Sequence, residues 1–388
     1  MKLAQPFYKL VFPTNSGGFD AQWESCFNEL TSLLSDTNTR AFRLHIFMAY
    51  DSNKDFKSRS ARISQSFAAC SQCPPFSIIS QAPEHPYEVI ISAGFYNAKE
   101  AEVTYSGPLY PHACSIKSGD YEEYWMLGVS PESQDGAVTE SASSIHDTLA
   151  AYCSQLGITM NEVVRQWNYI GKILDFTQVE GKPRQHYQVF NDARKIFYQQ
   201  ARNAPYYPAA TGIGKQTPGI LIDCMAVNAP GGLDIIPIHN PSQEDSYHYG
   251  QEVLKGVADK AMGMKQPPLF ERAVLLATTQ SSRLLISGTA AIKGQQTIAL
   301  GDVRRQTEVT IENINLLSAQ RTLMTQYPTL AIYPEKYSYV WVYVANREDI
   351  PLVRSICNGC FGDAPVNYVQ ADVCRDDLLV EIEAERIS

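Results

Sequence analysis

Two carboxylates near the C-terminus, Glu381 and Glu383, have the side-chain type and the spacing needed for acid–base chemistry. They alternate with aliphatic residues in the sequence from Val366 to Ile387, which predicts two strands joined by a tight polar turn at residues 375–377. Because side chains on a strand alternate between its faces, both carboxylates point to the same side. A strand with acids on one face is usually half-solvated, so we expect Glu383 on a wet face. For Glu381 two interpretations stay open, a solvated acid and a functional one.

The composition indicates an ordinary globular protein. The chain has 388 residues, 44% of them hydrophobic and 19% charged, which suits two or three domains with a sizeable core. The formal net charge is -9, and the sequence contains no run of lysines and arginines. Nucleic acid and anionic membrane surfaces are therefore excluded as expected partners, although a few local arginines are enough to bind a small anion.

The cysteines predict free thiols in a reducing compartment. They are odd in number and scattered, the N-terminal residues lack a long apolar core, and no segment reaches the length of a membrane span. We expect a cytoplasmic protein. The pairs Cys70-x-x-Cys73 and Cys357-x-x-Cys360 lie far apart and have no neighbouring ligands, so we predict small buried side chains, no metal and no cofactor.

The same order of predicted elements occurs three times along the chain, which indicates internal repeats. Each pass contains strands and helices whose apolar residues recur at three- and four-residue steps. We predict an α+β chain of three units, mixed sheets backed by helices, over residues 1–120, 121–269 and 270–388. The helix-free face of each sheet must be covered by another unit or another subunit.

The predicted elements are as follows. Strands are expected at residues 8–12, 40–50, 76–80, 87–96, 124–130, 163–173, 219–227, 283–292 and 337–346, besides the two C-terminal strands. Helices are expected from residue 20, over residues 60–70, 145–156, 190–202 and 350–357, and after an N-cap at Asp302. Residues 98–121 and 228–270 are expected to link the units, the second as a wrapped excursion rather than a free tether.

An overlay of the three closing strands places Ile90, Asp223 and Glu381 at one equivalent position, with alanines coinciding three residues later. Two of the three units therefore carry a carboxylate where an aliphatic side chain would be enough for a strand. An acid on a wet face and an acid with a function both remain open at this position.

The segment from Tyr206 to Gly214 is glycine-rich but does not fit a phosphate loop, because Ala209 takes the place of the first glycine and no helix follows. It is either a strand edge whose amides approach a ligand or a simple bulged turn. Tyr207 and its neighbour either stack on a ligand ring or fill the core.

The third unit resembles the YjgF/RidA family in two motifs, Ser287-Gly288-Thr289 in an early strand and Glu381-Ile382-Glu383-Ala384 in the last one. Members of this family are trimers whose ligand sites lie in clefts between subunits, so the resemblance implies a homotrimer. Val366 stands where the imine-deaminating members carry an arginine, which argues against that reaction.

A wider resemblance, over roughly residues 120 to 388, is to the chorismatases. It is carried by five separated segments in the right order: residues 167–173, 190–194, 207–214, 286–290 and 368–384. The resemblance implies a trimeric enzyme that removes pyruvate from chorismate, giving a cyclohexadiene diol acid or a hydroxybenzoate. It implies no cofactor.

The resemblance also implies roles for individual residues. Glu381 matches the catalytic acid of the family, which protonates the methylene carbon of the enolpyruvyl group, and Cys374 stands where hydroxybenzoate-forming members carry a cysteine. A carboxylic acid in a partly apolar cleft is suited to that proton donation. The residues expected around the substrate carboxylates and ring are Cys374, Arg375, Gly288, Thr289, Tyr207, Thr211, Arg194 and Arg202.

Two functions from different classes remain open. The first is a chorismatase-like lyase or hydrolase with Glu381 as general acid. The second is a non-catalytic or differently catalytic small-molecule binder, favoured by Gln295 where many chorismatases have histidine and by Ala345 where they tend to have arginine. Ordinary alternatives for the arginines are solvated helix ends for Arg194 and Arg202, and an ion pair within the turn for Arg375.

Overall fold

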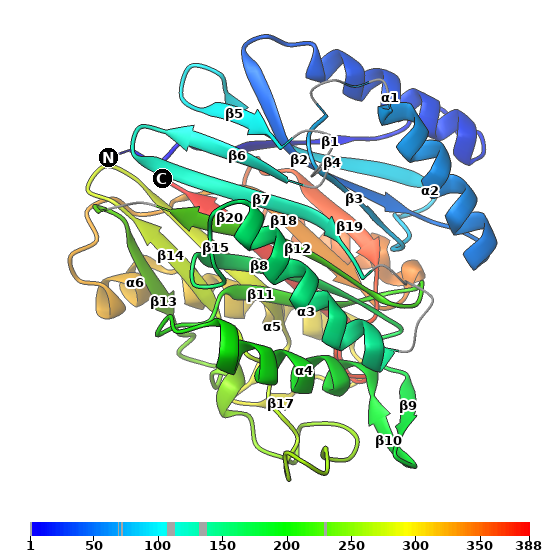
Figure 1. The fold of residues 1–388 in the computed structure, drawn as a ribbon, viewed down its shortest axis with the longest axis vertical. Coiled ribbons are helices and arrows are strands. Elements are labelled where there is room, and N and C mark those ends of the chain that lie inside the picture. The colour runs from blue at the N-terminus through cyan, green and yellow to red at the C-terminus, as the bar shows by residue number, and fades with distance from the viewer. Residues whose placement is uncertain (1, 69, 71–72, 107–112, 132–137, 229–230) are drawn as a thin grey trace.

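Three large β-sheets form the centre of the computed structural model, which describes residues 2–68, 70, 73–106, 113–131, 138–228 and 231–388 (Figure 1). Each sheet contains the same four-strand core, in which two antiparallel pairings are followed by one parallel pairing. The α+β prediction of tandem units with mixed sheets is confirmed by this threefold recurrence.

The spatial order of the strands differs from their order along the chain. The first sheet contains β1 (Phe7–Val11), β4 (Val89–Asn97), β2 (Thr39–Met48) and β3 (Phe76–Ile79). The second contains β11 (Ala209–Lys215), β8 (Val163–Gly171), β12 (Ile220–Asn228), β7 (Tyr121–Val129), β6 (Ala113–Ser118) and β5 (Glu102–Tyr105). The third contains β13 (Asp234–Ile238), β14 (Ala273–Ala277), β15 (Ser282–Ala290), β20 (Val380–Ile387), β18 (Lys336–Val344) and β19 (Val366–Gln370).

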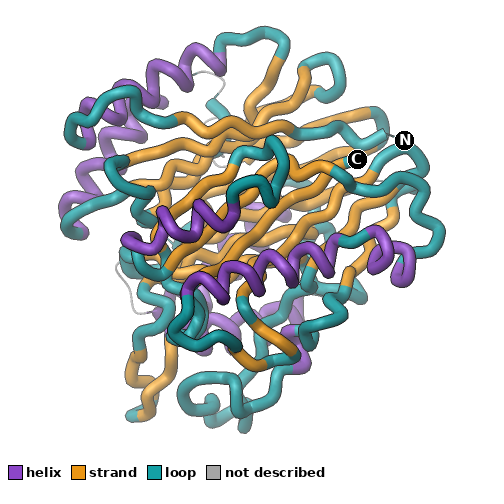
Figure 2. Tube along the Cα trace, turned by 180° about the vertical axis from the view of Figure 1, so that it is seen from behind, coloured by secondary structure: helices purple, strands orange, loops and turns teal. Residues whose placement is uncertain are grey.

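The helices cover the outer faces of the sheets, and the strands run through the middle of the molecule (Figure 2). They are α1 (Phe19–Leu34) and α2 (Asn53–Phe67) on the first sheet, α3 (Val138–Gln155) and α4 (His186–Ala201) on the second, and α5 (Val303–Ser318), α6 (Gln320–Gln326) and α7 (Ile350–Cys357) on the third. Two short hairpins, β9 (Phe176–Val179) with β10 (Lys182–Gln185) and β16 (Ile292–Lys293) with β17 (Gln296–Thr297), project from the sheets.

Most predicted elements are confirmed within a few residues. The Asp302 side chain accepts a hydrogen bond from the Arg305 amide at 2.9 Å, as the predicted N-cap requires. The helix expected from residue 60 begins at Asn53, because Ser52 already caps the amide of Asp55. The segment from Tyr206 to Gly214 contributes β11, a regular edge strand parallel to β8, rather than a bulged turn.

The two C-terminal strands do not pair with each other, although the polar turn between them predicted a hairpin. β20 lies between β15 and β18, and β19 pairs in parallel with the far side of β18. Parts of the expected linkers also belong to the sheets: β5 and β6 extend the second sheet, and β13 extends the third. Residues 107–112 and 229–230 of these linkers lie outside the described part of the chain.

The inner faces of the three sheets enclose one shared apolar core. At its centre lies Arg43, which is fully buried and surrounded by aromatic rings. The ring centroids lie 4.6–5.3 Å from its Cζ atom and belong to Tyr8, Trp125, Trp167, Tyr339 and Trp341. Cation–π contacts thus partly replace the hydration of this buried guanidinium.

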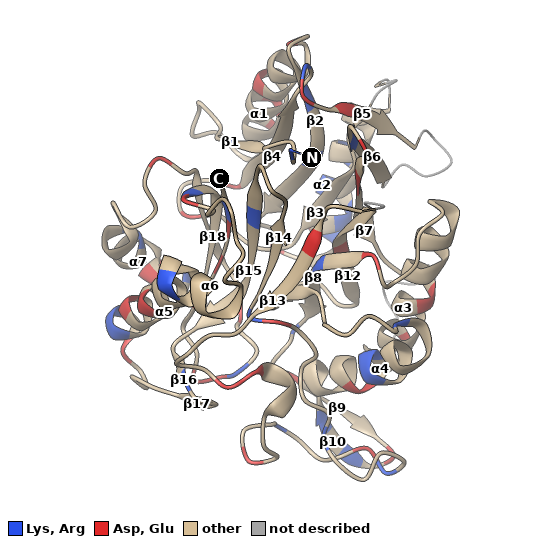
Figure 3. Cartoon of the chain, turned by 90° about the vertical axis from the view of Figure 1, so that its left-hand side faces the viewer, with Lys and Arg blue, Asp and Glu red and all other residues tan. Residues whose placement is uncertain are grey.

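The prediction that Glu383 lies on a solvated face of β20 is wrong. Glu383 is 0% exposed and Glu385 is 1% exposed, because the other two sheets cover the helix-free face of the third sheet. Arginines make this burial possible: Arg165 on β8 pairs with Glu383, and Arg283 on β15 pairs with Glu385 and with Glu123 on β7. Charged residues accordingly lie on strands β2 and β15 as well as on the helices (Figure 3).

The strand registers also correct the overlay of the repeats. Asp223 lies opposite Trp167 and Glu383 lies opposite Trp341, in equivalent strands. Glu381 lies opposite Tyr343, at the place that Leu221 and Ile90 occupy in the other sheets. Asp223 is therefore the counterpart of Glu383, and Glu381 is the one acid among the three equivalent positions.

Residues 239–268, called the strap, leave the third sheet after β13 and return before β14. A 3-10 turn at Ser246–His248 and a hydrogen bond from the Arg184 side chain to Asp259 hold parts of the strap against the body. Within the described residues, no helix has the length and apolar character that a membrane crossing would require.

We predict that Arg283→Met lowers the free energy of unfolding by about 3–5 kcal/mol, because it leaves the buried Glu123 and Glu385 carboxylates without their cation. The midpoint of urea-induced unfolding measures the effect. Arg305→Met is the matched control, since Arg305 also pairs with two glutamates, but at the exposed surface. Equal midpoints for the two variants would contradict the prediction.

Candidate active site

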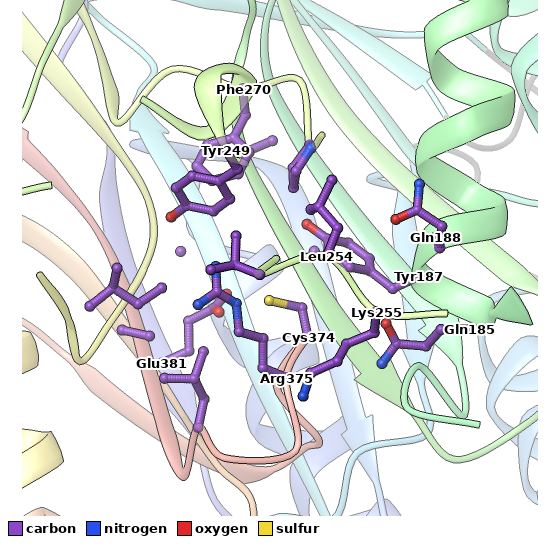
Figure 4. A pocket seen from close by; sticks show the side chains of 18 of the residues that line it. Gln185, Tyr187, Gln188, Tyr249, Leu254, Lys255, Phe270, Cys374, Arg375 and Glu381 are labelled. Atoms are coloured by element: carbon purple, nitrogen blue, oxygen red, sulfur yellow. The ribbon is translucent and has the colours of Figure 1, made fainter. Parts of the chain in front are cut away.

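A pocket lies between the second and third sheets and under the strap (Figure 4). It encloses about 660 Å³ of space between atoms, counting the part that opens to solvent. Its walls come from β11 and the start of α4 on one side, and from β15, β20 and the segment after β19 on the other. The cleft that the resemblance placed between subunits is therefore built within a single chain.

Glu381 lies at the inner end of this pocket and is 5% exposed. It makes no hydrogen bond and no ion pair with any residue that the structure describes. Burial raises the pKa of Glu381 to about 8, the neighbouring Glu383 carboxylate raises it as well, and the cations Arg165 and Arg272 act in the opposite direction. At neutral pH this carboxylic acid therefore holds a proton that it can donate.

The absence of a side chain at Gly288 leaves the space that the Glu381 carboxylate occupies. A Cβ atom on Gly288 would lie 2.0 Å from Oε1 of Glu381 and 3.3 Å from Cγ2 of Thr211. Its amide donates a hydrogen bond to the Thr211 hydroxyl at 3.2 Å, which fixes the backbone at this point. The glycine of the Ser-Gly-Thr motif is thus required by the close approach of the acid.

Two arginines supply positive charge to the pocket wall. Arg272 and Arg375 both lie next to Tyr249, with their Cζ atoms 5.5 Å and 5.1 Å from the ring centroid. Arg272 also donates to the Tyr249 hydroxyl at 2.7 Å, and Arg375 donates to the carbonyl of Gln295 at 2.8 Å. The predicted ion pair of Arg375 within its own turn is wrong, because these neighbours hold its guanidinium instead.

The strap closes the outer side of the pocket. Its residues Tyr249, Val253 and Leu254 form a small buried apolar cluster, and Lys255 lines the pocket beside them. The Lys255 ammonium pairs with Asp376 at 3.2 Å across the mouth. The strap thus excludes water from one side of the pocket and contributes a third cation.

Cys374 and Tyr187 form the wall next to Glu381. Burial raises the pKa of the Cys374 thiol to about 12, and the Glu381 carboxylate adds to this effect, so the thiol is neutral. The Tyr187 ring packs so closely on Gly212 that a Cβ atom there would lie 3.0 Å from it. Cys374 is therefore a neutral wall residue rather than a nucleophile.

The structure brings four of the predicted site residues together in this pocket and places the other five elsewhere. Glu381, Gly288, Cys374 and Arg375 line it. Thr211 lies behind the wall, where its hydroxyl donates to Glu383 at 2.5 Å. The Thr289 hydroxyl is buried and donates to the backbone carbonyl of Ser287.

The remaining three predicted residues lie in α4 or shortly after its end. Arg194 is buried over the Phe190 ring and donates to Asn191, and Arg202 donates to backbone carbonyls including that of Tyr206. Neither arginine is the solvated helix end that its ordinary alternative predicted. Tyr207 lines a separate surface groove together with Arg202.

Several pocket residues were missed by sequence reasoning. They are Arg272, Tyr249, Lys255, Phe270, Tyr187, Gln185 and Gln188. Two of them belong to the strap, which the sequence marks only as a Pro- and Gly-rich excursion, two directly follow it, and three lie at the start of α4. The one available signal was Phe270-Glu271-Arg272, a charged pair directly before an apolar strand.

We predict that Gly288→Ala displaces the Glu381 carboxylate, because the new methyl group and Oε1 cannot both keep their places. A crystal structure of the variant should show Oε1 moved by at least about 1 Å, which is the shift that restores ordinary contact. Gly18→Ala is the control, since nothing lies within 4 Å of a Cβ atom there. An unmoved Glu381 in the Gly288 variant would contradict the close approach described above.

Comparison with known proteins identifies relatives. Residues 113–226 match the family model described as chorismatase FkbO/Hyg5-like, N-terminal. A 3-hydroxybenzoate synthase from Streptomyces hygroscopicus is 32% identical over 270 residues, which cover 68% of this chain and 74% of that protein. A chorismatase from the same organism is 30% identical over 261 residues, or 67% of this chain and 71% of that protein.

The fold agrees with these relatives. A crystal structure of a chorismatase superposes with a TM-score of 0.69 and 23% identity, and the match covers 100% of this chain and 99% of that one. Sequence identity of this extent over two thirds of the chain, together with the common fold, assigns the protein: it belongs to the chorismatase family.

Proposed function

We propose that this protein removes pyruvate from chorismate, or from a closely related enolpyruvyl carboxylate, with Glu381 as the proton donor. The observation that carries the proposal is a buried carboxylic acid that is protonated at neutral pH and lies in a pocket walled by cations. Family membership and the names of the relatives support the choice of substrate. No step requires a cofactor.

The first step is proton transfer to carbon. The enolpyruvyl group is a vinyl ether, and donation of the Glu381 proton to its methylene carbon leaves an oxocarbenium ion and a Glu381 carboxylate. The new carboxylate lies beside the cation and stabilises it in a site of low polarity. The strap keeps bulk water away from this intermediate, so that only a positioned nucleophile reaches it.

The second step breaks the ether bond. Water adds to the oxocarbenium carbon, and the proton that it releases returns to Glu381. With water as nucleophile, the resulting hemiketal breaks down to pyruvate and a cyclohexadiene diol acid. The relatives include both a 3-hydroxybenzoate synthase and chorismatases, so the second product is either a hydroxybenzoate or a cyclohexadiene diol acid. Chromatography of the products distinguishes these two acids.

Recognition of the substrate carboxylates falls to Arg272, Arg375 and Lys255. An arginine binds a carboxylate with two parallel hydrogen bonds, and both arginines of the pocket are more than nine-tenths buried, which strengthens such a contact. Gln185 and Gln188 at the start of α4 add amide groups for the ring hydroxyls. Arg194 and Arg202, which were expected in this role, lie outside the pocket lining.

We place this activity in the cytoplasm, which the nine free cysteines support. A homotrimer of the whole chain stays a prediction, and light scattering measures it. The pocket itself does not depend on one, since its described lining comes from a single chain.

We predict that the purified protein releases pyruvate from chorismate and that Glu381→Gln slows this release by about 10²- to 10⁴-fold, the usual contribution of a general acid. Coupled oxidation of NADH by lactate dehydrogenase measures the pyruvate. Glu312→Gln is the control, because Glu312 is an exposed glutamate of α5 that does not line the pocket. Absence of pyruvate from the unaltered protein would leave the small-molecule binder as the function.

We predict that kcat falls as the pH rises through about 8, because Glu381 must be protonated to act and its pKa is raised to that value. Below this pH the donor keeps its proton, so kcat should stay level down to the range in which other groups titrate. Initial rates at saturating chorismate between pH 6 and pH 10 give the profile. A kcat that increases across this range would contradict proton donation by Glu381.

A further inference from the structure

Glu381 and Glu383 lie two residues apart on the same face of β20 and have opposite surroundings. Four groups hold the Glu383 carboxylate: the Trp167 indole at 2.6 Å, the Thr211 hydroxyl at 2.5 Å, the Tyr343 hydroxyl at 3.2 Å and the Arg165 guanidinium at 2.9 Å. Glu381 has no hydrogen-bond donor among the residues that the structure describes. Of two adjacent carboxylates, the one with four donors is ionised and the one without donors keeps a proton.

We propose that Glu383 is a positioning residue for the reaction, whose fixed negative charge holds the proton on Glu381 until the substrate takes it. This inference rests on the proposed function and goes beyond it, since it assigns the state of the acid to a second side chain that never touches substrate. The same charge favours the return of the proton, because two ionised carboxylates side by side repel each other. Glu383 thereby resets the donor after each turnover.

Thr211 links the Glu383 carboxylate to the backbone next to Glu381. Its hydroxyl donates to Glu383, accepts from the Arg165 guanidinium at 2.8 Å and accepts from the Gly288 amide at 3.2 Å. Gly288 in turn lies so close to Glu381 that a Cβ atom there would displace the Glu381 carboxylate. Glu383 thus helps to fix Glu381 through Thr211 and Gly288.

Other charged and titratable groups also face Glu381 and influence whether it keeps its proton. They are Arg165 from β8, Tyr187 from α4, Arg272 before β14, Cys374 and Arg375 after β19, and Lys255 from the strap. The cations among them favour the ionised form of Glu381. Among the residues that the structure describes, Glu383 is the neighbour whose charge opposes them, since burial keeps the thiol and the phenol neutral.

The test measures the proton directly. Infrared spectra of the full chain report the C=O band of a protonated carboxylic acid, and the band missing from Glu381→Gln belongs to Glu381. In the unaltered protein we expect this band to disappear with a midpoint near pH 8. In Glu383→Gln we expect the midpoint at least about one pH unit lower, because a like charge has gone and Arg165 is left unpaired. The alkaline limb of kcat should move by the same amount.

Glu385→Gln is the matched control. Glu385 lies on the same strand, is equally buried and also pairs with an arginine, but it is four residues from the donor. Both variants break a buried ion pair and should lose similar stability, whereas only Glu383→Gln should move the midpoint. If Glu383→Gln does not fold, the double variant Arg165→Met with Glu383→Gln removes both charges and should still lower the midpoint, by a smaller amount.

The outcomes separate the two proposals. A midpoint that is unmoved in Glu383→Gln, or moved equally in Glu385→Gln, overturns the role of Glu383. A midpoint of the unaltered protein close to that of an exposed glutamate, near pH 4.3, overturns it as well. A protein that shows the expected titration shifts but releases no pyruvate overturns the proposed function and leaves the role of Glu383 in place.

Discussion

Ion pairs buried between the three sheets fix how the sheets meet. Arg165 of the second sheet pairs with Glu383 of the third, and Arg283 of the third pairs with Glu123 of the second. The first sheet joins the same network through Tyr96, whose hydroxyl donates to Glu123 at 2.9 Å. Removing an unpaired charge from water costs on the order of several kcal/mol, so any packing that separates these partners is strongly disfavoured. The pocket lies between the second and third sheets, which these ion pairs hold together.

Equivalent strand positions of the three sheets differ in chemistry. Near the contact of the first two sheets, Asp223 accepts hydrogen bonds from Ser77 and from the amide of Gly128, and it contacts His45 at 3.0 Å. This acid is fully satisfied and buried, as is its counterpart Glu383. The proton donor lies two residues earlier on the same face of its strand, where the other two sheets have the aliphatic residues Leu221 and Ile90. The contact between the second and third sheets is distinguished by two neighbouring acids: Glu383 accepts several hydrogen bonds, and Glu381 accepts none from the described residues.

Periodicity and capping predicted most helices and strands, because those signals are local. They did not predict the register of the repeats. The overlay was shifted by two residues in the second unit, and a shift of two keeps every side chain on its face, so the alternation of polar and apolar residues cannot detect it. The spacing from Asp223 to Ala226 also equals that from Glu381 to Ala384, which made the shifted alignment attractive.

The candidate site was predictable only where a motif carried it. Glu381, Gly288, Cys374 and Arg375 came from segments with a family pattern, whereas Arg272 and the strap residues reach the pocket through contacts between distant parts of the chain. The wet face expected for Glu383 failed for a related reason: a strand sequence shows that one face is polar, but it does not show that arginines from another sheet cover that face.

The joining of three similar sheets in one polypeptide has a consequence for how such a protein changes over generations. In a ring of identical subunits, every substitution appears at all seams at once, so a change that favours chemistry at one seam must be tolerated at the others. In this chain each substitution occurs once per molecule. One junction can therefore hold a reactive acid while the Asp223 junction serves as a structural clamp, and each junction can specialise separately.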